Sequence, residues 1–149
     1  MPIRVDALRL LGRRDYTAAE LTDKLAKRGY GEDEIAGLTS QLRAERALDD
    51  RRVAEAHVRA ASRVKRRGRL RIERELLARG VDHAIVRDAL TALSADDDLA
   101  AMREVLKRRH VPATLDAASR RRVFQHFLRR GFSADAIARV LGRRDEDEG

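Results

Sequence analysis

The stretch Arg79-Gly80-Val81 recurs on both sides of itself at a fixed distance. Arg28-Gly29-Tyr30 lies 51 residues before it, and Arg130-Gly131-Phe132 lies 51 residues after it. Apolar residues at matching positions keep the same spacing: Leu21, Ile72 and Val123; Leu25, Leu76 and Phe127; Ile35, Val86 and Ile137. A fixed period of this length is the sequence signature of a repeat protein. The chain is therefore expected to contain three copies of one unit.

The residues around each glycine predict a helix, a tight turn and a second helix. Apolar residues spaced three and four apart precede each glycine, as on one face of a helix. Glycine ends a helix favourably because it enters the left-handed conformation without a Cβ penalty. The apolar residue after each glycine and another five positions later have the spacing of a hydrophobic staple. Between them stand the N-cap candidates Gly31, Asp82 and Ser133.

The predicted fold is all-α, with three tandem three-helix repeats of about 51 residues in an elongated, curved array. The repeats are expected over residues 1–47, 48–94 and 95–144. An acidic tail over residues 145–149 is expected to be disordered. A unit of about 50 residues buries little surface alone, so each repeat is expected to lean on its neighbours.

Local signals predict where individual helices begin and end. In the first repeat, Val5, Leu8 and Leu11 are expected on one side of a short helix, and Thr17 and Glu20 form a capping box before the next helix. In the second, Asp49 and Asp50 precede a helix running to about Arg66, whose buried side includes Val64, and Gly68 starts the following helix. In the third, Asp96-Asp97-Asp98 begin a helix, residues 111–118 form a loop and Ser119 caps the second helix.

Composition excludes several classes of function. The chain has no cysteine, so a disulfide framework, a thiolate metal site and a cysteine nucleophile are excluded. The N-terminus lacks the apolar run of a signal peptide, and no stretch approaches 18 apolar residues, which predicts a cytoplasmic protein without a membrane segment. The four histidines are scattered and the glycines are helix stops. We therefore expect no catalysis, no metal and no cofactor.

Charge is concentrated in the middle of the chain. Arginine outnumbers lysine 29 to 4, and the formal net charge is +8. Residues 51–81 hold eleven Arg or Lys and three Glu, so this block alone carries a net charge of +8. A concentrated basic block attracts polyanions or acidic protein surfaces. Single arginines elsewhere are expected to be solvated.

Helical spacing gathers many of these arginines on the outer sides of the first and second helices of the repeats. We predict a filament- or DNA-binding surface made of Arg52, Arg59, Arg63, Arg66, Arg67, Arg69, Arg71, Arg74, Arg121, Arg122 and Arg129. The third helices do not fit DNA recognition, because they begin with acidic or small residues such as Glu32-Asp33-Glu34. Few aromatics are available to stack on bases, so contact without sequence reading is expected.

The order and spacing of these motifs resemble the RecX family of regulatory proteins over nearly the whole chain. The motifs that carry the resemblance are Tyr16-Thr17-Ala18-Ala19-Glu20-Leu21, Lys27-Arg28-Gly29-Tyr30, Leu48-Asp49-Asp50-Arg51-Arg52-Val53-Ala54, Ile72-Glu73-Arg74-Glu75-Leu76 with Gly80-Val81, and Phe127-Leu128-Arg129-Arg130-Gly131-Phe132-Ser133. The chain departs from the family at Val53, where phenylalanine is usual, and just before Gly68, where an aromatic residue is usual.

The resemblance implies a regulator of the RecA recombinase, with roles in DNA repair, recombination and the SOS response. Such a protein would lie in the groove of the RecA–single-stranded DNA filament as a monomer. It would oppose filament growth and so damp strand exchange, ATP hydrolysis and co-protease activity. From the residues alone, two alternatives stay open. One is an accessory protein that binds single-stranded or double-stranded DNA without sequence specificity, and the other is a helical protein–protein adaptor.

Overall fold

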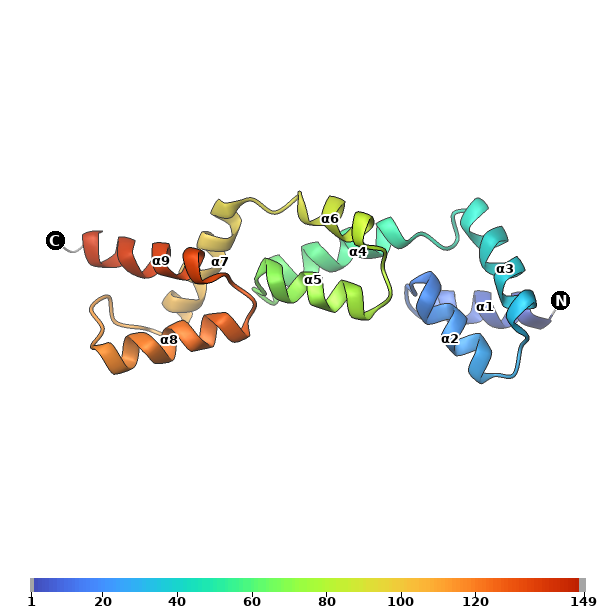
Figure 1. Cartoon of the computed structure of the whole chain (residues 1–149), viewed down its shortest axis with the longest axis horizontal. Helices are drawn as coiled ribbons and strands as arrows, with labels where there is room; N and C mark the ends of the chain where they lie inside the picture. The colour runs from blue at the N-terminus through green and yellow to red at the C-terminus, as the bar shows by residue number, and fades with distance from the viewer. Residues whose placement is uncertain (1, 148–149) are drawn as a thin grey trace. The chain divides into compact units, whose positions relative to one another are not determined.

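The computed structural model describes residues 2–147, and every regular element in this range is a helix (Figure 1). The all-α prediction is confirmed, with three α-helices in each repeat. The elements are α1 Pro2–Arg13, α2 Ala18–Lys27, α3 Glu32–Ala44, α4 Asp50–Arg59, the π-helical segment η1 Ala60–Val64, α5 Arg69–Ala78, α6 His83–Leu90, α7 Ala95–Arg108, α8 Ala117–Arg129 and α9 Ala134–Asp147.

The chain divides into two compact units. One comprises Met1–Ala56 with Leu76–Ala89, and the other His57–Glu75 with Leu90–Gly149. The division falls inside the middle repeat, so α4 and α5 each contribute residues to both units.

The three repeated glycines close the same turn. Gly29, Gly80 and Gly131 have φ values of +95°, +82° and +94°. In each turn the glycine N–H donates to the carbonyl three residues earlier, at 3.0 Å. The N–H of the next residue donates five residues back, at 3.1–3.3 Å. These two bonds are the Schellman motif, which satisfies carbonyls at the helix end and confirms the predicted caps.

The first repeat has its own apolar core between α1, α2 and α3. Thr17 and Glu20 form the predicted capping box at the start of α2. The buried side of α1 is Ile3, Ala7 and Leu10, whereas Val5 and Leu8 are 48% and 43% exposed. The side of α1 that carries Val5 and Leu8 is therefore not the buried side. Two apolar spacings were available in this short helix, and packing against α2 and α3 selects the other one.

The first helix of the middle repeat changes its geometry before it ends. The Asp49 carboxylate accepts the Arg51 N–H at 3.0 Å and so caps α4. From Ala60 the helix continues as η1, where the Lys65 N–H donates five residues back to the Ala60 carbonyl at 3.2 Å. A π-helical turn holds more residues than an α-helical turn, so later side chains rotate away from the α-helical pattern. Val64 is consequently 71% exposed, and its predicted burial was wrong.

The third repeat forms the core of the second unit. Ser94 caps α7 and makes a reciprocal capping box with Asp97. Asp116, rather than Ser119, caps α8, since its carboxylate accepts the Ser119 N–H at 2.7 Å. The predicted cap and the predicted loop end were thus wrong by about three residues, because Asp116 and Ser119 are both good N-caps one turn apart. Phe127 and Phe132 meet edge to face within this core.

The third helices begin where the sequence predicts. Gly31 stands at the N-cap of α3, while the Asp82 and Ser133 side chains accept N–H groups at the starts of α6 and α9. Helix α9 runs to Asp147, so the expected acidic tail over 145–149 overlaps its last three residues. Residues 148 and 149 lie outside the described residues. The repeat boundaries and the disorder of the tail stay predictions.

Candidate nucleic-acid interface

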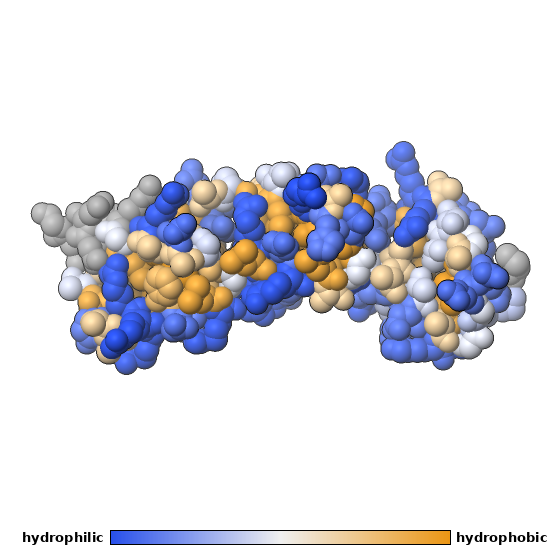
Figure 2. Space-filling model, in the orientation of Figure 1, coloured by the Kyte–Doolittle hydropathy of each residue, from blue (hydrophilic) through white to orange (hydrophobic). Residues whose placement is uncertain are grey.

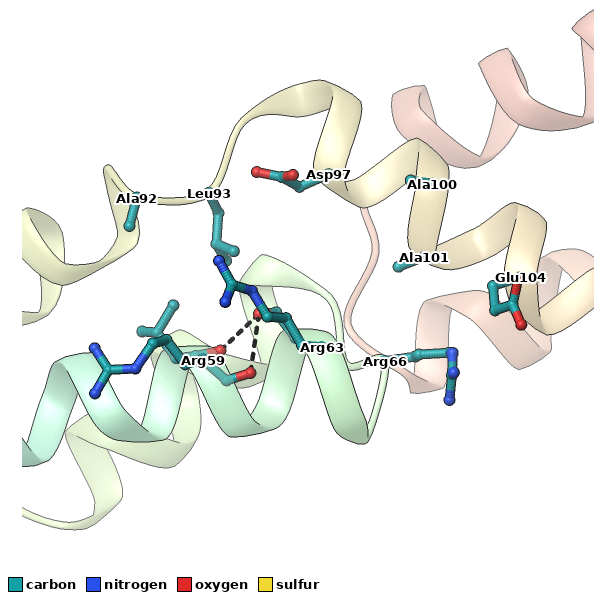
Figure 3. Close-up of a pocket in the computed structure, with 11 residues that line it drawn as sticks. Arg59, Arg63, Arg66, Ala92, Leu93, Asp97, Ala100, Ala101 and Glu104 are labelled. Atoms are coloured by element: carbon teal, nitrogen blue, oxygen red, sulfur yellow. Dashed lines mark hydrogen bonds between the residues drawn. The ribbon is translucent and has the colours of Figure 1, made fainter.

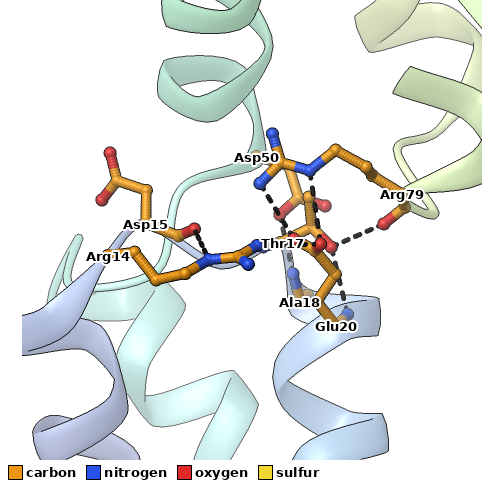
Figure 4. A network of polar contacts seen from close by, with 7 residues as sticks. All are labelled: Arg14, Asp15, Thr17, Ala18, Glu20, Asp50 and Arg79. Atoms are coloured by element: carbon orange, nitrogen blue, oxygen red, sulfur yellow. Dashed lines mark hydrogen bonds and ion pairs between the residues drawn. The ribbon is translucent and has the colours of Figure 1, made fainter. Parts of the chain in front are cut away.

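In the first unit, the turn after α5 rests on the start of α2. We call the four residues Thr17, Glu20, Arg79 and Gly80 the first junction (Figure 4). The Thr17 hydroxyl donates to the Arg79 carbonyl at 2.6 Å. The Arg79 guanidinium donates two hydrogen bonds to the Glu20 carboxylate, from Nη2 to Oε1 at 3.0 Å and from Nε to Oε2 at 3.3 Å. This bidentate pair fixes the turn on the helix.

Glu20 is the electrostatic centre of the first junction. A second guanidinium, from Arg14, reaches Glu20 Oε2 at 3.1 Å. Burial raises the pKa of Glu20, but hydrogen bonds from Arg79 and from the Thr17 backbone outweigh it, helped by the charges of Arg79 and Arg14. The net result is a pKa below the ordinary value. Glu20 is therefore ionised and forms ion pairs with both Arg79 and Arg14, offsetting one of their two positive charges.

An equivalent junction lies in the second unit, where the turn after α8 rests on the start of α5. We call Gly68, Arg71, Arg130 and Gly131 the second junction; each is 51 residues after its counterpart in the first. The Gly68 N–H donates to the Arg130 carbonyl at 2.7 Å, and the Leu70 N–H donates to the Gly131 carbonyl at 3.0 Å. A Cβ on Gly68 would lie 2.4 Å from the Gly131 carbonyl carbon, so glycine is required by this close approach.

The charges of the second junction are not balanced. Arg71 occupies the position that Glu20 has in the first junction, so an acid is replaced by a base. Arg130 donates to backbone carbonyls instead, Nη2 to Lys65 at 2.8 Å and Nε to Arg66 at 3.4 Å. Burial lowers the pKa of the Arg130 guanidinium, and nearby positive charges lower it further. These charges are on Arg109, Arg71, Arg66 and Arg67.

A pocket of about 320 Å³ in the second unit brings three of the predicted residues together (Figure 3). Arg59, Arg63 and Arg66 line it from the end of α4, from η1 and from the turn that follows. Across from them, α7 contributes Asp97 and Glu104, so the pocket carries both signs of charge. Hydrogen bonds from Ser94, and then the charges of Arg63 and Arg69, lower the pKa of Asp97.

Two predicted residues already have partners within the protein. Arg67 pairs with Glu75, and both side chains are half-buried. Arg69 donates Nη1 to the Leu90 carbonyl at 3.1 Å and Nη2 to the Leu93 carbonyl. These contacts hold the second helix of the repeat in place and leave fewer donors for a ligand.

The other predicted residues lie in three places. Arg52 belongs to the first unit and donates to the carbonyls of Arg46 and Ala47. Arg71 is half-buried at the second junction and Arg74 is exposed on α5. A third group lines a shallow pocket on α8: Arg121, Arg122 and Arg129. The predicted interface stays a prediction.

Arg109 and Arg130 belong to the group of arginines at the second junction, but the predicted set of binding residues does not include them. From the sequence, Arg130 is predicted only as part of the repeated glycine turn. One sequence signal could have found them. The repeat position that holds Glu20 in the first repeat holds Arg71 in the second, and the arginine before the turn glycine recurs in all three repeats as Arg28, Arg79 and Arg130. Such a charge reversal marks a junction that differs electrostatically from its counterpart.

Among the described residues, no group of three or more His, Cys, Asp or Glu could hold a metal ion. No helix in the described part of the chain is long and apolar enough to cross a membrane. On the face shown in Figure 2, hydrophilic residues are interrupted by small apolar areas. The large apolar side chains that are exposed are Val5, Leu8, Val64 and Leu70.

These features define a class of protein: an all-helical protein of three-helix repeats with arginine-rich surfaces. Sequence models of the RecX family match the first three-helix domain at residues 4–37, the second at 49–90 and the third at 96–141. Regulatory protein RecX of Halorhodospira halophila is 40% identical over 150 residues, covering 98% of this chain and 90% of that protein. Regulatory protein RecX of Chromobacterium violaceum is 36% identical, covering 97% and 93%. The chain therefore belongs to the RecX family of regulatory proteins.

Solved structures agree on the fold. The crystal structure of RecX from Lactobacillus salivarius matches with a TM-score of 0.85 at 24% identity, covering 97% of this chain and 95% of that one. A second crystal structure, of regulatory protein RecX, matches with a TM-score of 0.83 at 19% identity and covers 95% and 70%. At these identities the likeness concerns the fold.

Proposed function

We propose that this chain regulates the RecA recombinase by binding the RecA–single-stranded DNA filament and inhibiting its growth. Strand exchange, ATP hydrolysis and co-protease activity would fall as a consequence. The observation that carries the proposal is membership of the RecX family across all three repeats. In this proposal the chain acts as a monomer in the cytoplasm and needs no cofactor.

The arginine-rich surfaces support contact with a charged filament. The block over residues 51–81 carries the whole net charge of the chain. Arg59, Arg63 and Arg74 are exposed, and none has an ion pair with a described residue. Exposed guanidinium groups contribute little to folding, so they are available for phosphates or acidic side chains. Contact of this kind reads charge and shape rather than base sequence.

The proposal is tested by following RecA filament assembly on single-stranded DNA with this chain at substoichiometric amounts. Slower growth or net disassembly is expected. A protein that binds the bare DNA without altering filament growth would be a general DNA-binding accessory protein. Unchanged assembly at saturating concentrations of the chain would overturn the proposal.

A matched pair of triple variants separates the basic surface from net charge. Arg59→Gln, Arg63→Gln and Arg74→Gln together should weaken inhibition and lower the slope of log affinity against log salt by up to about two units. Arg9→Gln, Arg13→Gln and Arg43→Gln remove the same charge from exposed positions in the first repeat. If both triple variants lost inhibition to the same extent, net charge alone would explain the loss, and the 51–81 block would have no specific role.

A further inference from the structure

The two junctions have the same backbone contacts but opposite charge at one position. In the first junction, the Glu20 carboxylate lies between the guanidinium groups of Arg79 and Arg14. In the second, Arg71 replaces that acid beside Arg130, the counterpart of Arg79. The Arg71 backbone abuts the turn, since a Cβ on Gly131 would lie 2.4 Å from the Arg71 nitrogen. The second junction therefore places like charges where the first has an ion pair.

The guanidinium groups at the second junction have unused donors. Arg130 has five N–H groups, and the carbonyls of Lys65 and Arg66 take one each. Among the residues that the structure describes, neither Arg71 nor Arg109 makes an ion pair with a carboxylate. Arg66 has φ of +51°, the left-handed conformation common just past a helix end, and its carbonyl accepts from Arg130 Nε.

The positive charges are close enough to affect one another. Arg109, Arg71, Arg66 and Arg67 each lower the pKa of Arg130, after the effect of burial. Arginine remains charged at neutral pH despite such repulsion. Arg67 is neutralised by Glu75, whereas Arg66, Arg71, Arg109 and Arg130 have no ion pair with any residue that the structure describes. A bound anion would relieve this repulsion and use the free donors.

We propose that Arg66, Arg71, Arg109 and Arg130 form an oxyanion-binding site, in which one phosphate-class anion takes the role that the Glu20 carboxylate plays in the first junction. The anion bridges the start of α5 and the turn after α8, so its binding stabilises the second unit. Tetrahedral oxyanions fit this cluster because several oxygens can accept from several guanidinium forks at once.

The source of the anion is a phosphodiester of single-stranded DNA, and this assignment rests on the proposed function. Four cations exceed the single charge of one carboxylate or one phosphodiester, but a nucleic-acid backbone also brings neighbouring phosphates close to the one in the site. The anion site itself rests on the geometry of the second unit alone. Its failure can therefore be distinguished from failure of filament regulation.

The site is tested by thermal melting in sodium sulfate, at ionic strength held constant with sodium chloride. The melting temperature of the wild type should rise along a saturating curve, by about 3 °C or more at tenfold excess over the dissociation constant. Arg71→Glu rebuilds the acid of the first junction. This variant should melt at a higher temperature than wild type without sulfate and show no saturating response.

Arg103→Glu is the matched control, since it makes the same charge change at an exposed position of α7 in the same unit, outside the predicted interface. It should keep the wild-type response to sulfate. A saturating response in Arg71→Glu, or none in the wild type, would overturn the site. A response lost equally in Arg71→Glu and Arg103→Glu would also overturn it, because general charge would then explain the effect.

The source is tested with a fluorescent oligo-dT strand in a buffer without sulfate. Arg71→Glu should bind the strand at least about fivefold more weakly than Arg103→Glu, and sulfate should compete with the strand on the wild type. Equal affinities of the two variants for oligo-dT would overturn the assignment to DNA. If the two variants bound oligo-dT equally but differed in affinity for the RecA filament, the anion would be an acidic side chain of RecA instead.

Discussion

Gly29 and Gly131 close the same kind of turn at φ of +95° and +94°, but their surroundings differ. A Cβ on Gly29 would meet nothing within 4 Å. A Cβ on Gly131 would lie 2.2 Å from the Cβ of Arg71 and 2.4 Å from its nitrogen. Rotation of a side chain cannot relieve contacts with backbone atoms. Glycine is therefore required at position 29 only by the positive φ angle. At position 131 it is required also because a Cβ would overlap Arg71.

The pair provides a controlled test of stability. Gly29→Ala should lower the free energy of unfolding by about 1–2 kcal/mol, the cost of a left-handed conformation for a residue with a Cβ. Gly131→Ala should cost about 3 kcal/mol or more, because the turn must also move away from α5. Urea denaturation of both variants measures the difference. Equal costs would mean that the second junction adjusts freely.

Glu20 makes the first junction dependent on pH. Its pKa is lowered in the folded protein, so its stabilising contribution is present above the unfolded value of about 4.3 and is lost as pH falls through the folded pKa. Glu20→Gln should destabilise the protein by about 1 kcal/mol at pH 7. The difference from wild type should shrink below about pH 4. Glu55→Gln, at an exposed position, is the control, and melting across pH 3–8 is the measurement. A constant difference over that range would contradict the ion pair.

Some features of single residues can be predicted from the sequence and others cannot. The glycine turns and the capping box at Thr17 were predicted because all their groups lie within a few residues of one another. The charges around Arg130 were not, since they come from separate segments that meet only in the folded chain. The predicted arginines also included Arg69, whose hydrogen bonds to the Leu90 and Leu93 carbonyls depend on tertiary packing.

The repeat pattern predicted the number and order of the helices better than the residues at which each helix ends. The α4 helix shows why. Its apolar spacing continues to Val64, yet the change to π-helical geometry at Ala60 turns that side chain to solvent. Ser62 donates its hydroxyl to the Val58 carbonyl at 2.7 Å within the same stretch, an interaction that often accompanies bends in helices. Local apolar periodicity alone does not predict such a change of pitch.

Helix α6 occupies the place of a recognition helix in a helix-turn-helix, but we expect no role in reading DNA. His83 and Arg87 are exposed on it, and the Asp82 carboxylate caps it. Asp82→Asn keeps a capping side chain while removing the charge. Combined with His83→Ala and Arg87→Ala, it should leave filament inhibition largely intact. Selection of wild-type ligands from a random duplex library should find no motif; convergence on one sequence would contradict this.

At the scale of the whole molecule, the repeats use one helical framework for different electrostatic purposes. The first repeat contributes Glu20 to a junction closed by ion pairs with Arg79 and Arg14. The middle repeat carries the basic block, and its junction with the third repeat is left positively charged. Repeat proteins extend a binding surface by varying side chains on a constant framework. Membership of the RecX family explains the framework, and the charges indicate where an anionic partner would bind.

The central claim is that this chain acts on the recombinase filament rather than on DNA alone. The most direct measurement is its equilibrium affinity, at one salt concentration, for three ligands: the RecA–single-stranded DNA filament, the same DNA without RecA, and RecA without DNA. If the chain contacts both components of the filament, affinity for the filament should exceed that for either component by at least about tenfold. Equal affinity for the filament and for the bare DNA would contradict the claim.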